Sequence, residues 1–171
     1  MLKGVLVNDK VIAKGKEIKE FFEKSWYGEL KQDILELDLI EAAFLMERGR
    51  LEIELRGKKL SLKDIFNIGS ELKENFVVKF LVYKDLRTRG LPVRIGASGV
   101  DFFVYERGAK PNKHSGIKWL VFAYSENNAC SLDELERTAK LGKNIRAKVV
   151  WAIVDGDNDI TYYIVDMKKE L

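Results

Sequence analysis

Residues 105–115 bring together side chains that can move protons and bind anions. The segment holds the single histidine of the chain, His114, a tyrosine at the end of a predicted strand, Tyr105, and the cations Arg107, Lys110 and Lys113. An imidazole has an unperturbed pKa of about 6.5 and suits a general acid near neutral pH. A phenol, with a pKa of about 10, serves as a base only where positive charge favours the phenolate.

These groups could together cleave an RNA phosphodiester. A 2′-hydroxyl attacks its own phosphate when one group removes its proton, a second protonates the leaving 5′-oxygen, and a cation stabilises the transition state. This chemistry requires no metal. The other interpretation of the same residues is an ordinary solvated loop, with Tyr105 packed at the rim of the core.

Sequence signatures of other enzyme classes are missing. The chain contains no phosphate-binding loop of the Walker type, no dinucleotide fingerprint and no nucleophile elbow. One cysteine, Cys130, and one histidine are too few for a zinc site of the Cys/His type. We therefore expect no metal and no cofactor.

The composition is that of a globular protein. Among 171 residues 46% are hydrophobic, and 30 Lys and Arg oppose 27 Asp and Glu for a net charge of +3. A lone cysteine, the lack of a signal-like leader and the lack of an apolar run of roughly 20 residues predict a cytoplasmic protein without a membrane partner. The many Lys and Glu residues are typical of a thermophile.

Periodicity predicts the elements that must position these side chains. In the first half we expect strands at 4–7 and 10–14 around an Asn8-Asp9 turn, a helix from the N-cap Asp38 to Gly49, a strand at 51–55 and a helix at 61–72. In the second half we expect helices at 76–89 and 131–141 and strands at 93–95, 100–105, 117–124, 148–154 and 160–165. The order predicts an α/β (α+β) fold, in which a small N-terminal α/β domain (residues 1–75) packs on a C-terminal mixed-sheet nuclease domain (residues 76–171).

Several segments resemble the archaeal tRNA-splicing endonucleases (tRNA-intron endonucleases) of the small-subunit, homotetrameric type. The resemblance rests on LIEAAFL at 39–45, KFLVYKDLRTRG at 79–90, DFFVYERGA at 101–109, His114-Ser115 and AIVD at 152–155. It implies a metal-independent endoribonuclease, or tRNA-intron lyase, that acts on precursor tRNA. Introns would be excised at bulge-helix-bulge motifs, leaving 2′,3′-cyclic phosphate and 5′-hydroxyl ends.

The resemblance also implies roles for individual residues. Tyr105 matches the general base of the family and His114 the general acid, whereas Ala147 occupies the position of the third catalytic residue, a lysine. Lys148 is adjacent, but alternation along a strand predicts that it faces the opposite side unless a bulge intervenes.

Three explanations of Ala147 stay open. A deliberate Lys→Ala change would hold the enzyme inactive, Lys148 could substitute, or the chain could be a naturally impaired subunit. The alternative function is a noncatalytic RNA-binding or scaffold subunit of a heteromeric splicing endonuclease. A third hypothesis is an unrelated α/β binding domain with an exposed Tyr/His loop.

Assembly and RNA binding complete the expectations. In the family, a loop like that of Asp155, Asp157 and Asp159 docks into a positively charged cleft of another subunit, which implies a homotetramer built as a dimer of dimers. The strand at 160–165 is similar to the one that pairs subunits. RNA contacts are expected from Arg107, Lys113, Lys140 and Arg146.

Overall fold

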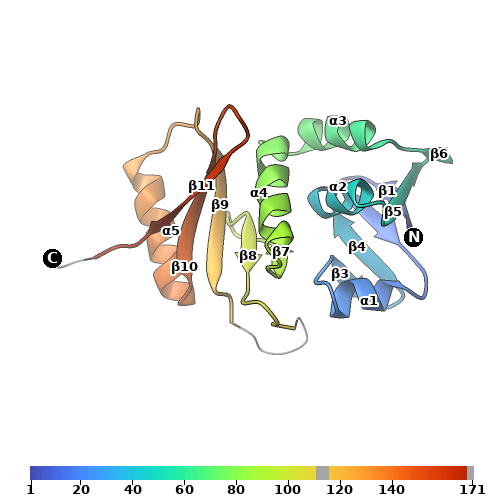
Figure 1. The fold of residues 1–171 in the computed structure, drawn as a ribbon, viewed down its shortest axis with the longest axis horizontal. Coiled ribbons are helices and arrows are strands. Elements are labelled where there is room, and N and C mark those ends of the chain that lie inside the picture. The colour runs from blue at the N-terminus through green and yellow to red at the C-terminus, as the bar shows by residue number, and fades with distance from the viewer. Residues whose placement is uncertain (111–115, 169–171) are drawn as a thin grey trace. The chain divides into compact units, whose positions relative to one another are not determined.

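The structure is a computed structural model that describes residues 1–110 and 116–168. These residues form two mixed sheets and five helices, so the predicted α/β (α+β) class is confirmed (Figure 1). The chain divides into two compact units, with residues 1–80 and Lys110 in the first and residues 81–109 and 116–168 in the second. This division falls within one helix, and the domain boundary expected before residue 76 remains a prediction.

The first unit is built on a six-stranded sheet with the order β3-β4-β2-β1-β5-β6. Only the β1–β5 pair is parallel in this sheet. The strands are β1 (Leu2–Val7), β2 (Lys10–Ala13), β3 (Glu29–Lys31), β4 (Ile34–Asp38), β5 (Leu51–Leu55) and β6 (Lys58–Lys59), and the helices are α1 (Ile18–Glu23), α2 (Leu39–Glu47) and α3 (Leu62–Leu72).

Local signals in the sequence account for the predicted elements of this unit. The β1–β2 hairpin turns at Asn8, which takes a left-handed conformation with φ 55°. Asp38 and Ser61 each begin a helix through a capping box, closed by Glu41 in α2 and by Asp64 in α3. The helices at 39–47 and 62–72 are therefore confirmed.

Residues 18–38 contain three elements that periodicity did not predict, which are α1, β3 and β4. Helix α1 has only six residues and no side-chain cap, and β3 has only three residues, so neither carries a strong periodic signal. A tight turn places Gly28 at φ 66°, where an added Cβ would lie 2.5 Å from the carbonyl oxygen of Glu36. Tertiary packing thus decides this region.

The second unit contains a five-stranded sheet with the order β11-β10-β9-β8-β7. The β9–β10 pair is parallel and the other pairs are antiparallel. The strands are β7 (Val93–Ile95), β8 (Phe102–Val104), β9 (Trp119–Ser125), β10 (Lys148–Val154) and β11 (Ile160–Val165), and the helices are the 81–88 part of α4 (Phe76–Thr88) and all of α5 (Leu132–Ile145).

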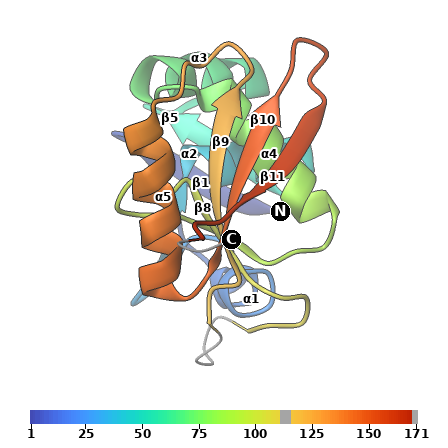
Figure 2. The same cartoon turned by 90° about the vertical axis from the view of Figure 1, so that its left-hand side faces the viewer.

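The two helices of this unit lie on opposite faces of the sheet (Figures 1 and 2). Toward α5, Leu120, Phe122 and Val149 form a buried cluster. Toward α4, the buried ring of Tyr83 packs on Phe102 with ring centroids 5.6 Å apart. Both faces of the central strands are thus covered, which explains their almost continuous apolar sequences.

The ends of several predicted elements differ from those observed. Helix α5 runs to Ile145 rather than to residue 141, β8 covers only Phe102–Val104, and β9 begins at Trp119 rather than at residue 117. Gly142 lies inside the helix and does not end it. An added Cβ there would lie 2.4 Å from Cγ2 of Val149, so the glycine allows α5 to approach β10.

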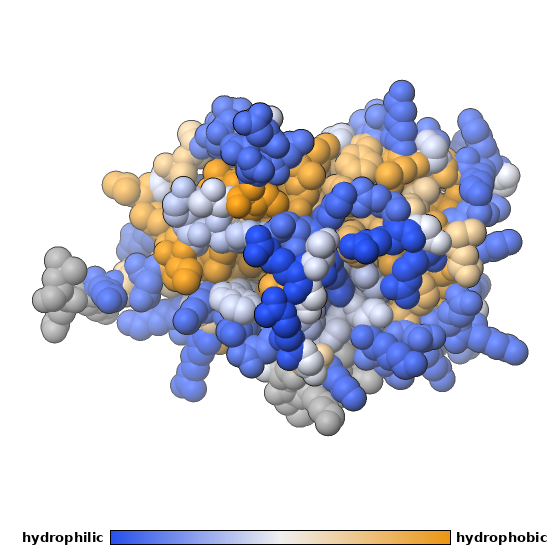
Figure 3. All heavy atoms as spheres, viewed as in Figure 1, coloured by the Kyte–Doolittle hydropathy of each residue, from blue (hydrophilic) through white to orange (hydrophobic). Residues whose placement is uncertain are grey.

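Strand β11 forms an edge of the sheet. Tyr163 and Ile164 are 55% and 67% exposed, and apolar surface gathers over β11 in a space-filling view (Figure 3). An exposed apolar edge strand is a template for pairing with another chain.

Candidate active site

Strand β8 ends, and strands β9 and β10 begin, at the same end of the sheet of the second unit. The Lys118 amide donates to the Val104 carbonyl at 2.9 Å, and the Lys148 amide donates to the Lys118 carbonyl at 3.0 Å. Tyr105 directly follows Val104 and Ala147 directly precedes Lys148. Two strand spacings of about 4.8 Å therefore separate the backbones at these two predicted site positions.

Tyr105 and Ala147 also belong to the same face of the sheet. Ala147 and Phe103 both pack against the buried cluster beneath α5. The Tyr105 amide donates to the Pro92 carbonyl at 3.0 Å, so the pairing of β7 with β8 continues one residue past β8. Because side chains alternate along a strand, Tyr105 falls on the face of Phe103, two residues earlier.

A pocket of about 1110 Å³ opens at this end of the sheet, and we name it the sheet-end pocket. Its lining comes from the segment after Tyr105, the start of β9, the last turns of α5, the start of β10 and the end of β11. The residues that line it are Glu106, Arg107, Gly108, Ala109, Gly116, Ile117, Lys118, Ala139, Gly142, Lys143, Arg146, Ala147, Lys148, Val149, Ile164, Val165, Asp166 and Met167.

The lining of the sheet-end pocket is rich in cations. Among the described residues it combines five basic side chains with the two acidic side chains of Glu106 and Asp166, and the basic ones are Arg107, Lys118, Lys143, Arg146 and Lys148. Such an excess of positive charge in a concave site attracts anions. The pocket is therefore suited to a phosphate group.

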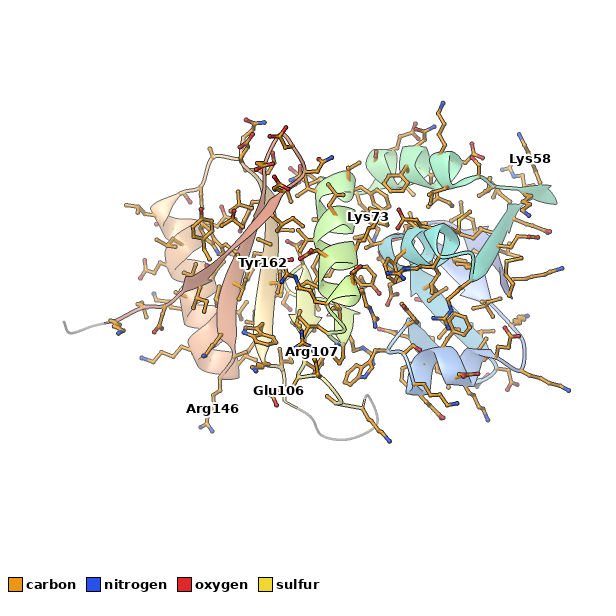
Figure 4. The ribbon with its side chains drawn as sticks, viewed as in Figure 1. Lys58, Lys73, Glu106, Arg107, Arg146 and Tyr162 are labelled. Atoms are coloured by element: carbon orange, nitrogen blue, oxygen red, sulfur yellow. The ribbon has the colours of Figure 1, made fainter. Side chains whose placement is uncertain are left out.

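Two contacts fix the segment that follows Tyr105. Arg107 donates from Nε and Nη2 to the carbonyl oxygen of Arg89, at 3.2 and 3.0 Å. Lys118 forms an ion pair with Glu106 at 2.8 Å, and this hydrogen-bonded cation lowers the pKa of the Glu106 carboxyl. Figure 4 shows Glu106 and Arg107 close to this end of the sheet.

Opposing effects act on the Tyr105 phenol. Its partial burial raises the pKa above the ordinary value, whereas the positive charge of Arg94 acts to lower it. Arg94 pairs across the strands with Phe103, which places it on the Tyr105 face of the sheet. The sequence indicates that positive charge is required near the phenol but does not identify Arg94, because the β7–β8 register cannot be read from the sequence.

The other predicted site residues are distributed as follows. Ala147, Lys148, Arg107 and Arg146 line the sheet-end pocket, and Tyr105 adjoins the segment that lines it. Lys140 is exposed on α5, where it forms an ion pair with Glu136 at 2.9 Å, and it is not among the described lining residues. His114 and Lys113 lie outside the described residues.

The acidic loop between β10 and β11 is internally ordered. The carboxylate of Asp155 accepts the amides of Asp157 and Asp159 through Oδ1, at 2.9 and 3.0 Å. Asp157 and Asp159 are exposed, so their carboxylates face solvent. Asp155 therefore shapes the loop, whereas the other two display charge.

The described part of the chain contains neither a cluster of metal ligands nor a membrane-spanning helix. Residues 1–110 and 116–168 contain no group of three or more His, Cys, Asp and Glu side chains arranged to hold a metal ion. None of the helices formed by these residues is long and apolar enough to cross a membrane.

Comparison with known proteins matches both halves of the chain. Residues 2–66 match the family described as tRNA intron endonuclease, N-terminal domain, and residues 76–162 match the tRNA intron endonuclease, catalytic C-terminal domain. The chain is 41% identical over 168 residues to a tRNA-splicing endonuclease of Methanococcoides burtonii, covering 98% of this chain and 46% of the relative. It thus spans about half the length of that relative and of three similar proteins from Methanosarcina.

Shorter relatives match along most of their length. A tRNA-splicing endonuclease of Thermococcus kodakarensis is 40% identical over 153 residues, which cover 89% of each chain. That of Thermococcus gammatolerans is 37% identical over 168 residues, which cover 97% of this chain and 98% of the relative. Because both family domains are present and these relatives match almost end to end, the chain belongs to the tRNA intron endonuclease family.

Proposed function

We propose that this chain is a metal-independent RNA endonuclease that excises introns from precursor tRNA at bulge-helix-bulge motifs. The observation that carries the proposal is the cationic sheet-end pocket beside Tyr105 and position 147, in a chain of this family. Relatives named tRNA-splicing endonuclease support precursor tRNA as the substrate. The expected products are a 2′,3′-cyclic phosphate and a 5′-hydroxyl.

The proposed reaction is an internal transfer within the RNA. The ribose 2′-oxygen forms a bond to the adjacent phosphorus while the bond from phosphorus to the 5′-oxygen breaks. Tyr105, as the phenolate, accepts the 2′ proton, and His114, as the imidazolium, donates a proton to the leaving 5′-oxygen. Cations of the sheet-end pocket stabilise the negative charge that accumulates on the phosphoryl oxygens.

Arg94 supports the proposed role of Tyr105. Burial alone disfavours the phenolate, and the charge of Arg94 opposes that effect. The cross-strand pairing of Arg94 with Phe103 keeps this cation beside the phenol without placing it in the lining of the sheet-end pocket.

Ala147 separates the main proposal from its alternative. With alanine at the position of the family lysine and no other cation in its place, we expect a rate on the order of a hundredfold to a thousandfold lower than that of the Ala147→Lys variant, as when one charge-stabilising donor is removed. The same alanine favours the second candidate function, a noncatalytic RNA-binding or scaffold subunit of a heteromeric enzyme.

Cleavage of a bulge-helix-bulge RNA tests the proposed function. The unmodified chain and Ala147→Lys are incubated with the RNA in EDTA, and product ends are identified by their resistance to phosphatase and their reactivity with polynucleotide kinase. Cleavage that leaves cyclic phosphate ends, by the unmodified chain or by Ala147→Lys, supports an endonuclease. RNA binding without cleavage by either variant supports the scaffold, and absence of RNA binding contradicts both functions.

We further propose that the chain self-associates as a homotetramer, a dimer of dimers. The exposed carboxylates of Asp157 and Asp159 and the exposed edge of β11 support this proposal. Asp157→Lys with Asp159→Lys should halve the mass measured by light scattering, because like charges would then meet in the positive cleft. Asp33→Lys, in another exposed turn, is the control, and an unchanged mass in the double variant would contradict the role of the loop.

A further inference from the structure

We infer that Lys143 supplies the positive charge that faces the reacting phosphate in the sheet-end pocket. It lies in the same wall of the pocket as Ala147, whose side chain carries no charge. The inference rests on the proposed function and deepens it. Lys143 lies in the last turn of α5 and lines the pocket together with Ala147. No sequence motif includes Lys143, so it was not among the predicted site residues.

Helical spacing directs Lys143 to the pocket. The α5 residues that line it are Ala139, Gly142 and Lys143, and Arg146 follows the helix. These positions are spaced i, i+3, i+4 and i+7 and so share one side of the helix. Lys140 does not belong to this set, and its ammonium forms an ion pair with Glu136.

The end of α5 is held close to position 147. The Ala147 amide donates to the Gly142 carbonyl at 3.0 Å, and the Cβ that Gly142 lacks would lie 2.9 Å from the Ala147 carbonyl oxygen. Lys143 is the neighbour of Gly142. Its long, flexible side chain therefore starts beside the same wall of the pocket as Ala147.

The other cations of the pocket are engaged or directed elsewhere. Arg107 is bound to the Arg89 carbonyl, and Lys118 is paired with Glu106. Lys148 begins β10, where it pairs with Trp119, and Ala147 directly before it packs on the α5 face of the sheet. Because side chains alternate along a strand, Lys148 belongs to the opposite face. Arg146 extends outward from the end of the unit (Figure 4). Lys143 has no side-chain ion pair with another described residue.

A cation is needed at this wall for a physical reason. The carbonyl end of a helix carries a partial negative charge, and the last turn of α5 contributes to the lining. A phosphate would be repelled there without a compensating charge. Lys143 offsets the helix end and leaves a net attraction for the phosphate.

Single-turnover cleavage of a bulge-helix-bulge RNA tests the inference. Lys143→Met should lower the rate of the unmodified chain by about 100-fold, and Lys143→Arg should retain most of it, because the charge is kept. In the Ala147→Lys background the same Lys143→Met change should lower the rate by less than about 5-fold, because the new lysine supplies the charge. Lys63→Met, at an exposed lysine of α3 outside the pocket lining, is the control with a small expected effect, and Lys148→Met tests the competing cation of the pocket.

The outcomes separate this inference from the proposed function. If Lys143→Met behaves like Lys63→Met, or if Lys148→Met causes the larger loss, Lys143 is not the catalytic cation. If only Ala147→Lys variants cleave above background, the inference is overturned and the endonuclease proposal stands. If no variant cleaves RNA that it binds, the proposed function itself fails. Equal circular dichroism spectra and melting temperatures verify that the variants are folded.

Discussion

The guanidinium of Arg107 donates two hydrogen bonds to the carbonyl oxygen of Arg89, from Nε at 3.2 Å and from Nη2 at 3.0 Å. Arg89 directly follows α4, so Arg107 satisfies a carbonyl at the negative end of that helix. The contact ties the segment after Tyr105 to α4.

Replacement of Arg107 should therefore affect the geometry of the site more than RNA attraction. Arg107→Met should lower stability by about 1 kcal/mol and the single-turnover rate by about tenfold, while the salt dependence of RNA affinity stays unchanged. Filter binding over a range of salt concentrations measures the latter. A salt slope reduced by about one unit would instead support the sequence-based prediction that Arg107 contacts RNA.

The proposed proton transfers predict a specific dependence of rate on pH. Below about pH 6.5 the imidazolium is fully formed and the phenolate fraction increases tenfold per pH unit, so the rate should rise with unit slope. Between about pH 6.5 and 10 the two fractions change in opposite directions and the rate should be flat. Single-turnover rate constants from quenched time courses at each pH give the profile. Tyr105→Phe should abolish the cleavage. A rate that keeps rising above pH 7 would contradict this pair of groups.

Tyr162 should make stability fall at alkaline pH. Burial and the hydrogen bond to Asp85 raise the pKa of its phenol above the ordinary value. The unfolded phenol ionises at about pH 10 while the folded one stays protonated, so this contribution is complete below pH 10 and declines above it. Urea unfolding at pH 8 and pH 11 measures the decline, which should be smaller in Tyr162→Phe. Tyr163→Phe, at an exposed position, should behave like the unmodified chain.

Gly142 should resist replacement even by alanine. Alanine favours a helix by about 1 kcal/mol, but its Cβ would meet Val149 Cγ2 at 2.4 Å and cost about 1–3 kcal/mol. We therefore expect Gly142→Ala to lower the free energy of unfolding. Asn144→Ala, at an exposed position of the same helix, should not lower it. A more stable Gly142→Ala variant would show that α5 can shift away from β10.

Asp38 should be critical for the N-terminal unit. Its side chain is only 3% exposed and accepts from Lys73 at 2.6 Å, from Lys10 at 3.3 Å and from the Ile40 amide at 2.9 Å. Figure 4 shows Lys73 in this unit. Asp38→Ala should cost about 3 kcal/mol because it removes a helix cap and leaves Lys73 without its carboxylate. Asp64→Ala, in the capping box of α3, should lower the free energy of unfolding by only about 1 kcal/mol. Thermal denaturation of both variants measures the difference.

The sequence by itself determined the elements whose signals are local. Asp38 with Glu41 and Ser61 with Asp64 specify where α2 and α3 begin, because a capping box involves residues only three positions apart. Tyr105 was predicted as a site residue in the same way, from the chemistry of its own segment, and this stays a prediction. The short α1, β3 and β4 were missed because their stability comes from packing rather than from periodicity.

Only the tertiary structure decided which distant residues meet. The β7–β8 register brings Arg94 to the Tyr105 face, and the pairing of β8, β9 and β10 places Tyr105 and Ala147 two strands apart on one face of the sheet. Neither relationship is encoded in local spacing, because a shift of one residue in register would turn each side chain to the opposite face. Burial of apolar residues on both faces of the central strands fixes that register, and with it the set of charges around the pocket.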